Sequence, residues 1–124
     1  MSTNSEEELR EHIRQFLREF KSLMWQGDFQ VFTNHLKNRE TLVRLGLTYK
    51  NREEEILGIS VENYSSGPNK DTLHDGYFWV FGKMLGKLEI YIKLKIVEYG
   101  NGNESAVCYS FHISEAPLKY PFRQ

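Results

Sequence analysis

The sequence predicts an α+β protein, in which an antiparallel β-sheet is packed by N-terminal and central helices. Apolar residues recur at three- and four-residue steps between residues 9 and 24, which is typical of an amphipathic helix. From residue 77 onward, three consecutive segments alternate with period two, as strands joined by short turns do. The 124 residues fit one domain, with a long helix over residues 5–26 and an α+β body over residues 28–124.

Charge and cysteine content exclude several classes of protein. The net charge of −1 argues against a protein that coats nucleic acid by bulk electrostatics. Four lysines gather in residues 83–95 against one glutamate, so an anion site would be local. The single cysteine, Cys108, excludes an intrachain disulfide and a cysteine-based metal site. The acidic N-terminus lacks a signal-peptide pattern and no segment could span a bilayer, so we expect a cytoplasmic protein with no membrane partner.

The N-terminal helix is predicted from its cap and its apolar stripe. Ser5 followed by Glu8 forms a capping box, and the helix should end near Gly27. We expect its apolar side to pack on the domain rather than on a partner or a membrane surface. The opposite face mixes Glu and Arg, so it should be solvated.

A short strand and two short helices are predicted next. Residues 28–36 alternate partly and suggest the strand. The first helix has Asn38 as its N-cap and Gly46 at its C-terminal turn. The second begins at Asn51, with Glu54 three residues on. Its expected buried side consists of Ile56, Leu57 and Ile59.

Two segments are expected to be irregular. Residues 65–76, which follow Tyr64, are rich in Gly, Pro, Asn and Asp and predict a loop of about a dozen residues. The tail, residues 114–122, holds two prolines and should run along the surface.

The turn at Asn101-Gly102 predicts the register of the last hairpin. Asn-Gly favours a two-residue type I′ turn. In that register the facing pairs are Tyr91 with His112, Lys93 with Ser110, Lys95 with Cys108, Ile92 with Phe111, and Leu94 with Tyr109. Both strands then agree about which face is core.

The preceding hairpin has two possible registers. A two-residue loop at Leu85 and Gly86 puts Phe78, Val80 and Gly82 on the Tyr91 face, whereas a three-residue loop puts Trp79, Phe81 and Lys83 there.

One sheet face therefore presents Tyr91, Lys93, Lys95, Ser110 and His112, with Lys83 beside them in one register. Lysines on a strand face can simply provide solubility and edge protection. The added phenol and imidazole point to metal-free RNA cleavage, in which the 2′-hydroxyl loses a proton, the leaving oxygen gains one and cations stabilise the phosphorane.

Metal and cofactor sites are not predicted. The four histidines show no ligand spacing, and the Glu triplets lie at predicted helix starts, where the helix dipole accounts for them. Cys108 is expected to be a buried thiol.

Five segments resemble the MqsR family of type II toxins in their order and spacing. They are LGLT (45–48), ILGISVENYSSGP (56–68), WVFGK (79–83), YIKLKI (91–96) and CYSFH (108–112). The resemblance implies a RelE-like α+β fold, metal-independent cleavage of messenger RNA and a cognate antitoxin protein as partner.

By this resemblance Tyr91, Lys93 and Tyr64 match a tyrosine, a lysine and a second tyrosine of the family. Ser65, Val80 and His112 depart from its pattern, where a lysine, a glutamine and a lysine stand. Lys83 could replace the missing lysine at 65 in space. We expect His112, Tyr91 and Lys93 to be catalytic, and Lys83, Lys95, Tyr64 and Ser110 to bind RNA.

Two other functions remain open at this point. The chain could be a binding module that kept the fold, lost catalysis and acts through protein partners. The second alternative is a metal-dependent enzyme of another class, which would lose activity when a chelator removes its metal.

Overall fold

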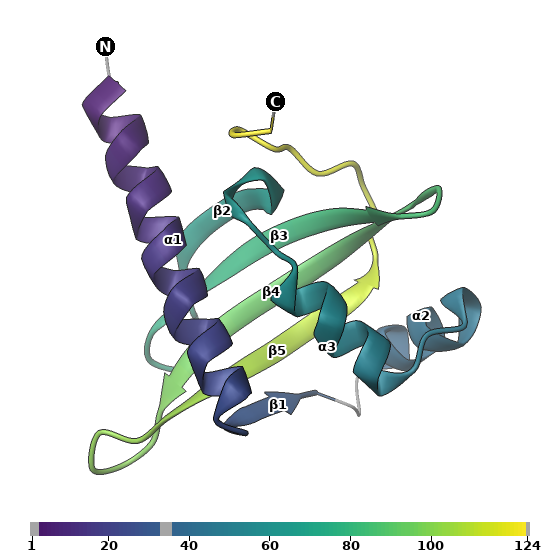
Figure 1. The fold of residues 1–124 in the computed structure, drawn as a ribbon, viewed down its shortest axis with the longest axis horizontal. Helices are drawn as coiled ribbons and strands as arrows, with labels where there is room; N and C mark the ends of the chain where they lie inside the picture. Colours follow the sequence, from purple (N-terminus) through teal and green to yellow (C-terminus); the bar gives the residue numbers. More distant parts are fainter. Residues whose placement is uncertain (1–2, 33–35, 124) are drawn as a thin grey trace.

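The structure is a computed structural model that describes residues 3–32 and 36–123. It has three α-helices and one five-stranded sheet (Figure 1). The elements along the chain are α1 (Thr3–Trp25), β1 (Phe29–Val31), α2 (Leu36–Leu45), α3 (Tyr49–Leu57), the short 3₁₀-helix η1 (Val61–Asn63), β2 (Tyr64–Lys70), β3 (Tyr77–Leu85), β4 (Leu88–Glu98) and β5 (Glu104–Ile113). The predicted α+β class is confirmed.

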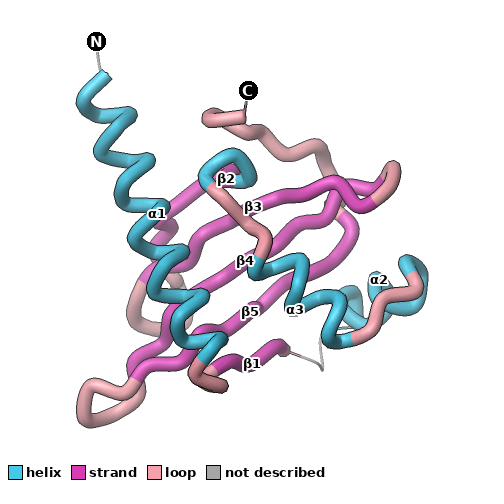
Figure 2. The backbone as a smooth tube through the Cα atoms, viewed as in Figure 1, coloured by secondary structure: helices cyan, strands magenta, loops and turns pink. Residues whose placement is uncertain are grey.

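The strand order in the sheet is β1-β5-β4-β3-β2. β2 to β5 form an antiparallel meander, as predicted for the last three strands, and β1 adds to β5 in parallel (Figure 2). β1 lies within the predicted strand over residues 28–36, of which residues 33–35 are outside the described residues.

Helices α1 and α3 cover one face of the sheet (Figure 1). Phe16 of α1 stacks on Trp79 and Phe81 of β3, with ring centroids 5.2 and 6.3 Å apart. Ile13 and Phe20 are fully buried beside it. Each such side chain contributes about 1.5–3 kcal/mol through the hydrophobic effect, so this layer holds the domain together. The prediction that α1 packs on the domain is confirmed.

The predicted start of α1 is wrong, because Ser5 lies inside the helix and not at its cap. Residues 4–8 are exposed, and the first turns project beyond the sheet (Figure 1). The helix continues to Thr3, because exposed terminal turns can extend or fray by a residue or two at little cost.

Helix α2 covers the edge of β5 that β1 leaves unpaired. The fully buried Asn38 side chain donates to Tyr109 O at 3.1 Å and accepts from Phe111 N at 2.9 Å, and Thr41 Oγ1 accepts from Ile113 N at 3.0 Å. These side chains satisfy the backbone groups that an edge strand would expose. Asn38 is therefore a bridge to β5, and its prediction as an N-cap is wrong. Gly46 does end the helix, with φ of +67°.

The N-cap of α3 is Thr48, three residues before the predicted one. Its side chain accepts from Asn51 N, and the Asn51 side chain accepts from Thr48 N, so the two form a reciprocal capping box. Asn51 was predicted as the cap because it precedes the Glu triplet, but it is the third residue of the helix. Ile56 and Ile59 are buried as expected, and Leu57 is half-buried.

The predicted loop over residues 65–76 is wrong in its first half, because β2 extends from Tyr64 to Lys70. β2 is an edge strand, which tolerates the proline and glycine that disfavour a central strand. Its pairing with β3 is irregular around Ser66 and Asn69. The tail over residues 114–122 is irregular, as expected, but Phe122 is buried against Tyr64.

The first hairpin adopts the register that places Phe78, Val80 and Gly82 opposite Lys95, Lys93 and Tyr91. Leu85 pairs with Leu88, so the loop consists of Gly86 and Lys87. It has two residues, as in the first alternative, but begins one residue later. Relative to that alternative, the pairing of β3 with β4 is shifted by two residues. An even shift keeps each side chain on the same face of the sheet.

The last hairpin follows the predicted register only from Ile90 to Lys93. Tyr91 faces His112 and Lys93 faces Ser110, whereas Lys95 faces Val107 instead of Cys108, and Leu94 faces Cys108 instead of Tyr109. The irregularity between Lys93 and Leu94 leaves Tyr109 without a partner on β4. The predicted two-residue turn is wrong, because Glu98 pairs with Glu104 and Tyr99 N donates to Asn103 O, which leaves a three-residue loop over residues 100–102. The irregularity at Tyr109 compensates this extra residue.

Candidate functional site

The candidate site lies on the sheet face opposite α1 and α3, here called the open face. The residues that point to this face are Phe78, Val80, Gly82, Tyr91, Lys93, Lys95, Ser110 and His112. The tail covers one end, because Leu118 N and Tyr120 Oη both donate to the Glu89 carboxylate, at 3.1 and 2.6 Å. A Cβ atom at Gly82 would overlap Leu118 and Tyr120, so a glycine is needed beneath the tail. Residues 71–76 cover the other end.

A hollow of about 450 Å³ lies between these covers and is called the central hollow. Its floor consists of Tyr91, Lys93, Ser110 and His112, and residues 114–118 of the tail form its wall. The structure thus brings together four of the seven predicted site residues.

Tyr91 and His112 form a stacked cross-strand pair. Their ring centroids are 5.3 Å apart with an interplanar angle of 18°. His112 Nδ1 lies 3.0 Å from Ile113 O, which can only accept, so Nδ1 carries a proton and Nε2 is the basic nitrogen of the neutral ring. Burial raises the pKa of the Tyr91 phenol, which keeps it protonated at neutral pH. The pair therefore offers a base and a proton donor side by side.

Lys93 is the available cation of the open face. Its Nζ lies over the Phe78 ring, 4.0 Å from the centroid, and 5.9 Å from the centroid of Tyr109. Among residues 3–32 and 36–123, no carboxylate lies within ion-pair distance of it. Aromatic faces stabilise an ammonium only modestly, so its charge can still attract a phosphate.

Lys95 shares this face but is not an open cation, contrary to the sequence prediction. It is only 2% exposed, and its Nζ donates to Asp71 Oδ2 at 2.8 Å. The Lys95 ammonium holds the pKa of the Asp71 carboxyl well below its usual range, helped by backbone bonds from Leu73 and His74. The pair neutralises itself and anchors residues 71–76 to the sheet.

Lys83 lies on the opposite face, so the prediction that it joins Tyr91 is wrong. Its Nζ lies 2.8 Å from Glu55 Oε1 and 2.9 Å from Glu55 O, near the C-terminus of α3. Lys21 Nζ donates to Ile59 O just beyond this helix end. Carbonyl groups at a helix C-terminus attract cations, which explains both contacts. Lys83 therefore cannot replace a lysine at position 65 in the site.

Tyr64 is also away from the site. It is 5% exposed, contacts Trp79 edge-on and donates from its hydroxyl to Gly67 O at 2.6 Å. Burial raises its phenol pKa. It follows η1 and begins β2, rather than ending a helix before a loop, and its position on the helix side separates it from RNA bound on the open face.

The sequence analysis missed four charged residues near His112. A hollow of about 290 Å³ on the α2 side of His112 is lined by the cations Lys37 and Arg44 and by the carboxylates Glu40 and Glu115, among others. Lys37 forms an exposed ion pair with Glu115, which lowers the pKa of that carboxyl. Lys37 and Arg44 are seven residues apart on α2, a spacing that places them on one helix face and could have indicated the site.

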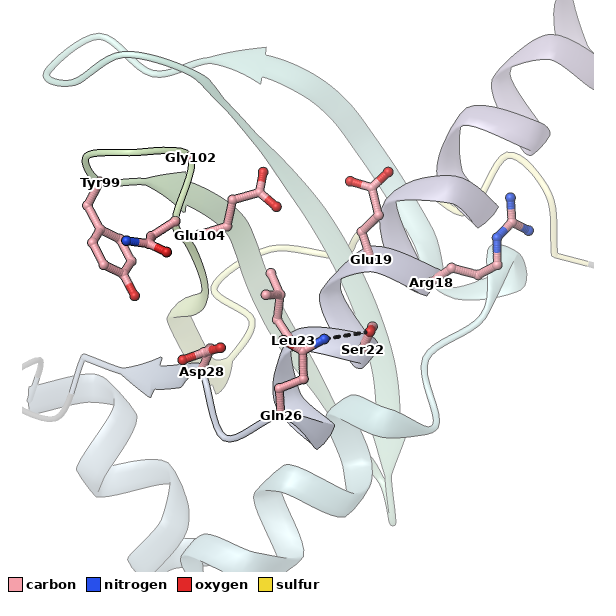
Figure 3. A pocket seen from close by; sticks show the side chains of 10 residues that line it. Arg18, Glu19, Ser22, Leu23, Gln26, Asp28, Tyr99, Gly102 and Glu104 are labelled. Atoms are coloured by element: carbon pink, nitrogen blue, oxygen red, sulfur yellow. Dashed lines mark hydrogen bonds between the residues drawn. The ribbon is translucent and has the colours of Figure 1, made fainter.

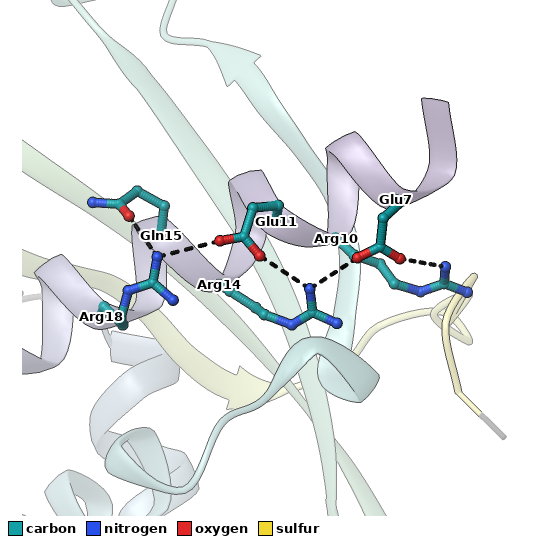
Figure 4. A network of polar contacts seen from close by, with 6 residues as sticks. All are labelled: Glu7, Arg10, Glu11, Arg14, Gln15 and Arg18. Atoms are coloured by element: carbon teal, nitrogen blue, oxygen red, sulfur yellow. Dashed lines mark hydrogen bonds and ion pairs between the residues drawn. The ribbon is translucent and has the colours of Figure 1, made fainter. Parts of the chain in front are cut away.

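Other charged surfaces fit an RNA ligand less well. Figure 3 shows a hollow between α1 and the β4–β5 turn, lined by the carboxylates Glu19, Asp28 and Glu104 with one cation, Arg18. Its net negative charge disfavours phosphate. The exposed face of α1 is a ladder of Glu–Arg contacts in which the charges pair along the helix, as expected for a solvated face (Figure 4).

Metal and thiol chemistry find no support in the described side chains. In that part of the chain, no group of three or more His, Cys, Asp and Glu residues could hold a metal ion. Cys108 is fully buried, and burial raises the pKa of its thiol to about 12. None of the described helices combines the length and apolar character that a bilayer crossing needs.

Comparison with known protein families, with curated proteins and with solved structures yields no match to the chain. The motif resemblance to MqsR toxins therefore stays a prediction, and functional inference rests on the geometry of the open face.

Proposed function

We propose that the protein is a metal-independent endoribonuclease that cleaves messenger RNA on its open face, as the toxin of a type II toxin-antitoxin pair. The observation that carries the proposal is the stacked Tyr91–His112 pair, with Lys93 two residues along β4 from Tyr91. A base, a proton donor and a cation within one hollow are the groups that cleavage of an RNA backbone requires.

In the proposed mechanism the 2′-hydroxyl of the RNA is the nucleophile. Nε2 of His112 takes its proton as the 2′-oxygen attacks phosphorus. The bond from phosphorus to the 5′-oxygen breaks, and Tyr91 donates its proton to that leaving oxygen. Lys93 stabilises the charge of the phosphorane. The products are a 2′,3′-cyclic phosphate and a 5′-hydroxyl. His112 then releases its proton to solvent, and solvent returns a proton to Tyr91, which restores the enzyme.

The resemblance to MqsR toxins supports the biological part of the proposal. It supplies the cognate antitoxin as protein partner, messenger RNA as substrate and a cytoplasmic location. Arg44 lies on the α2 side of His112 and can contact the same RNA strand, whereas Lys37 is already paired with Glu115.

Burial of the site favours a second candidate, an inactive binding module with this fold. His112 is 9% and Ser110 8% exposed, so RNA must enter closely beneath the tail to reach them. Position 65 also lacks the lysine of the MqsR pattern, and Lys83 cannot take its place because it is bound to Glu55 on the helix side. A profile of cleavage rate against pH separates the two functions, because general acid–base catalysis makes the rate depend on pH, whereas an inactive binding module cuts at no pH.

The first experiment is cleavage of a long, weakly structured RNA by the purified protein in excess chelator. Parent protein should cut, and His112→Ala should lose about 10²–10⁴-fold in rate, the usual contribution of a general base. His12→Ala is the matched control, because His12 is exposed on α1 and contacts Trp79 on the helix side. Thermal unfolding of each variant checks that it is folded. An inactive parent, or equal cutting by His112→Ala, contradicts the proposal.

A further inference from the structure

A second hollow on the open face lies beside Lys93 and has no role in the proposed chemistry. It has a volume of about 750 Å³ and is lined by residues 74–76, by Lys95 and Glu98 of β4, and by Tyr109 of β5. We call it the loop hollow. We propose that it binds a nucleobase carrying an exocyclic amino group, from the nucleotide whose phosphate lies at Lys93. The inference rests on the proposed function and names the part of the RNA that this site selects.

The wall of the loop hollow is held rigidly by Asp71. One carboxylate oxygen accepts from Lys95 Nζ, and the other accepts from Leu73 N at 2.9 Å and His74 N at 3.1 Å. Gly76 has φ of +99°, and a Cβ atom there would lie 3.1 Å from Lys95 Cε. The loop therefore passes directly over the lysine stem. A preformed wall lowers the ordering cost of binding a small planar ligand.

The aromatic side of the loop hollow is Tyr109. The register irregularity of β5 leaves this residue unpaired with β4, and bulges commonly redirect a side chain beside a functional site. Phe32 supports the ring edge-on, with centroids 4.4 Å apart. Lys93 Nζ is 5.9 Å from the ring centroid on the same face. A phosphate at Lys93 thus brings its own base near an aromatic surface on which it can stack.

The charges of the loop hollow suit a base and not a second phosphate. Lys95 is neutralised by Asp71, and the remaining ionised side chains are the carboxylates of Asp75 and Glu98. Carboxylates repel phosphate but accept hydrogen bonds from amino groups. Adenine, cytosine and guanine each carry an exocyclic amino group, and uracil does not. The hollow should therefore discriminate against uracil.

The test is an NMR titration of the full chain with AMP, CMP, GMP, UMP and ribose 5-phosphate, run beside the cleavage assay. All four nucleotides should bind about tenfold more tightly than ribose 5-phosphate, the usual contribution of one stacked base. The three amino-bearing nucleotides should in addition bind several-fold more tightly than UMP, because their amino groups donate to the carboxylates. Tyr109→Ala should reduce all nucleotides to the affinity of ribose 5-phosphate. Tyr109→Phe should keep the preference, because it retains the ring. Glu98→Gln combined with Asp75→Asn should raise UMP affinity toward that of the others.

The outcomes separate this inference from the proposed ribonuclease. Equal binding of all four nucleotides, unchanged in Tyr109→Ala, overturns the base site even if the parent cuts RNA. A base preference that depends on Tyr109 supports the site even if the parent cuts no RNA, which would remove only the catalytic proposal. Tyr99→Ala is the matched control, because Tyr99 is an exposed tyrosine near the far turn of the same hairpin and should bind like the parent.

Discussion

The two faces of β4 differ in what covers them. On the helix side Ile90, Ile92 and Leu94 are fully buried beneath α1 and α3. On the open face Tyr91 and Lys93 are half-buried, because only the tail and residues 71–76 cover that side. Helices provide enough apolar surface to exclude water, whereas two irregular segments leave hollows between them. The same strand therefore contributes to a core on one side and to a candidate site on the other.

The three lysines near the sheet show that strand position alone does not decide which cation can bind a ligand. Lys83 is bound to Glu55 on the helix side, and Lys95 to Asp71 on the open face. Lys93 contacts two aromatic rings instead. An ammonium in a partly buried ion pair has little attraction left for phosphate, so only Lys93 of the three should matter for RNA.

The largest expected effect is on the helix side. Phe81→Ala should lower the free energy of unfolding by about 3–5 kcal/mol, since it opens a cavity in a fully buried cluster. Phe78→Ala, the same change on the open face, should cost only about 1–2 kcal/mol because Phe78 is half-buried. Urea unfolding of both variants measures the difference, and equal losses would contradict the contrast between the faces.

Replacing Lys93 on the open face should affect RNA cleavage, whereas replacing Lys83 on the helix side should affect stability. Lys93→Ala should lower kcat/KM for RNA cleavage about 10²-fold and reduce the salt dependence of binding, because the phosphorane and a phosphate contact lose their cation. Lys83→Ala should leave cleavage unchanged and lower stability, because Glu55 loses its partner.

Steady-state cleavage and thermal unfolding of both lysine variants provide the measurement. Loss of cleavage in Lys83→Ala with normal cleavage in Lys93→Ala would reverse the assignment of the faces.

The Asp71–Lys95 pair should make stability depend on pH. Its folded-state carboxyl pKa is depressed, so its contribution is complete above the ordinary aspartate pKa of about 3.9 and is lost as pH falls toward the depressed value. The parent should therefore lose thermal stability below about pH 4 more steeply than Asp71→Asn, which lacks the titrating group. Unfolding midpoints from neutral to acidic pH test this, and parallel curves would show that the pair contributes nothing.

The last prediction concerns the reactivity of Cys108 on the helix side. With a thiol pKa of about 12 and no exposure, the native protein should react with a disulfide reagent at pH 8 only through unfolding. Because a domain stable by about 5 kcal/mol is unfolded for only about one molecule in several thousand, the rate should be at least about a thousandfold below that of the denatured chain. Rapid reaction of the folded protein would mean that the helix side opens to solvent.

Local patterns predicted the elements whose partners are close in sequence. Alternation over residues 77–113 and the turn signal at Asn101-Gly102 located the three-stranded meander, although the turn is one residue longer than predicted. β2 was missed because Gly67, Pro68 and Asn69 disfavour a strand, and pairing with β3 overrides that preference. Asn38 was misassigned because its hydrogen-bond partners on β5 are about seventy residues away.

The sequence by itself determined the α+β class and the three long strands, because period-two alternation acts over a few residues. The pairing of Tyr91 with His112 and of Lys93 with Ser110 agrees with the prediction, but it depends on the irregularity at Tyr109, which offsets the longer turn. Only the tertiary structure decided that Lys95 is bound to Asp71, that Lys83 faces the helices and that Tyr109 borders a hollow. Those outcomes depend on contacts between distant segments, which the spacing of residues along one strand does not determine.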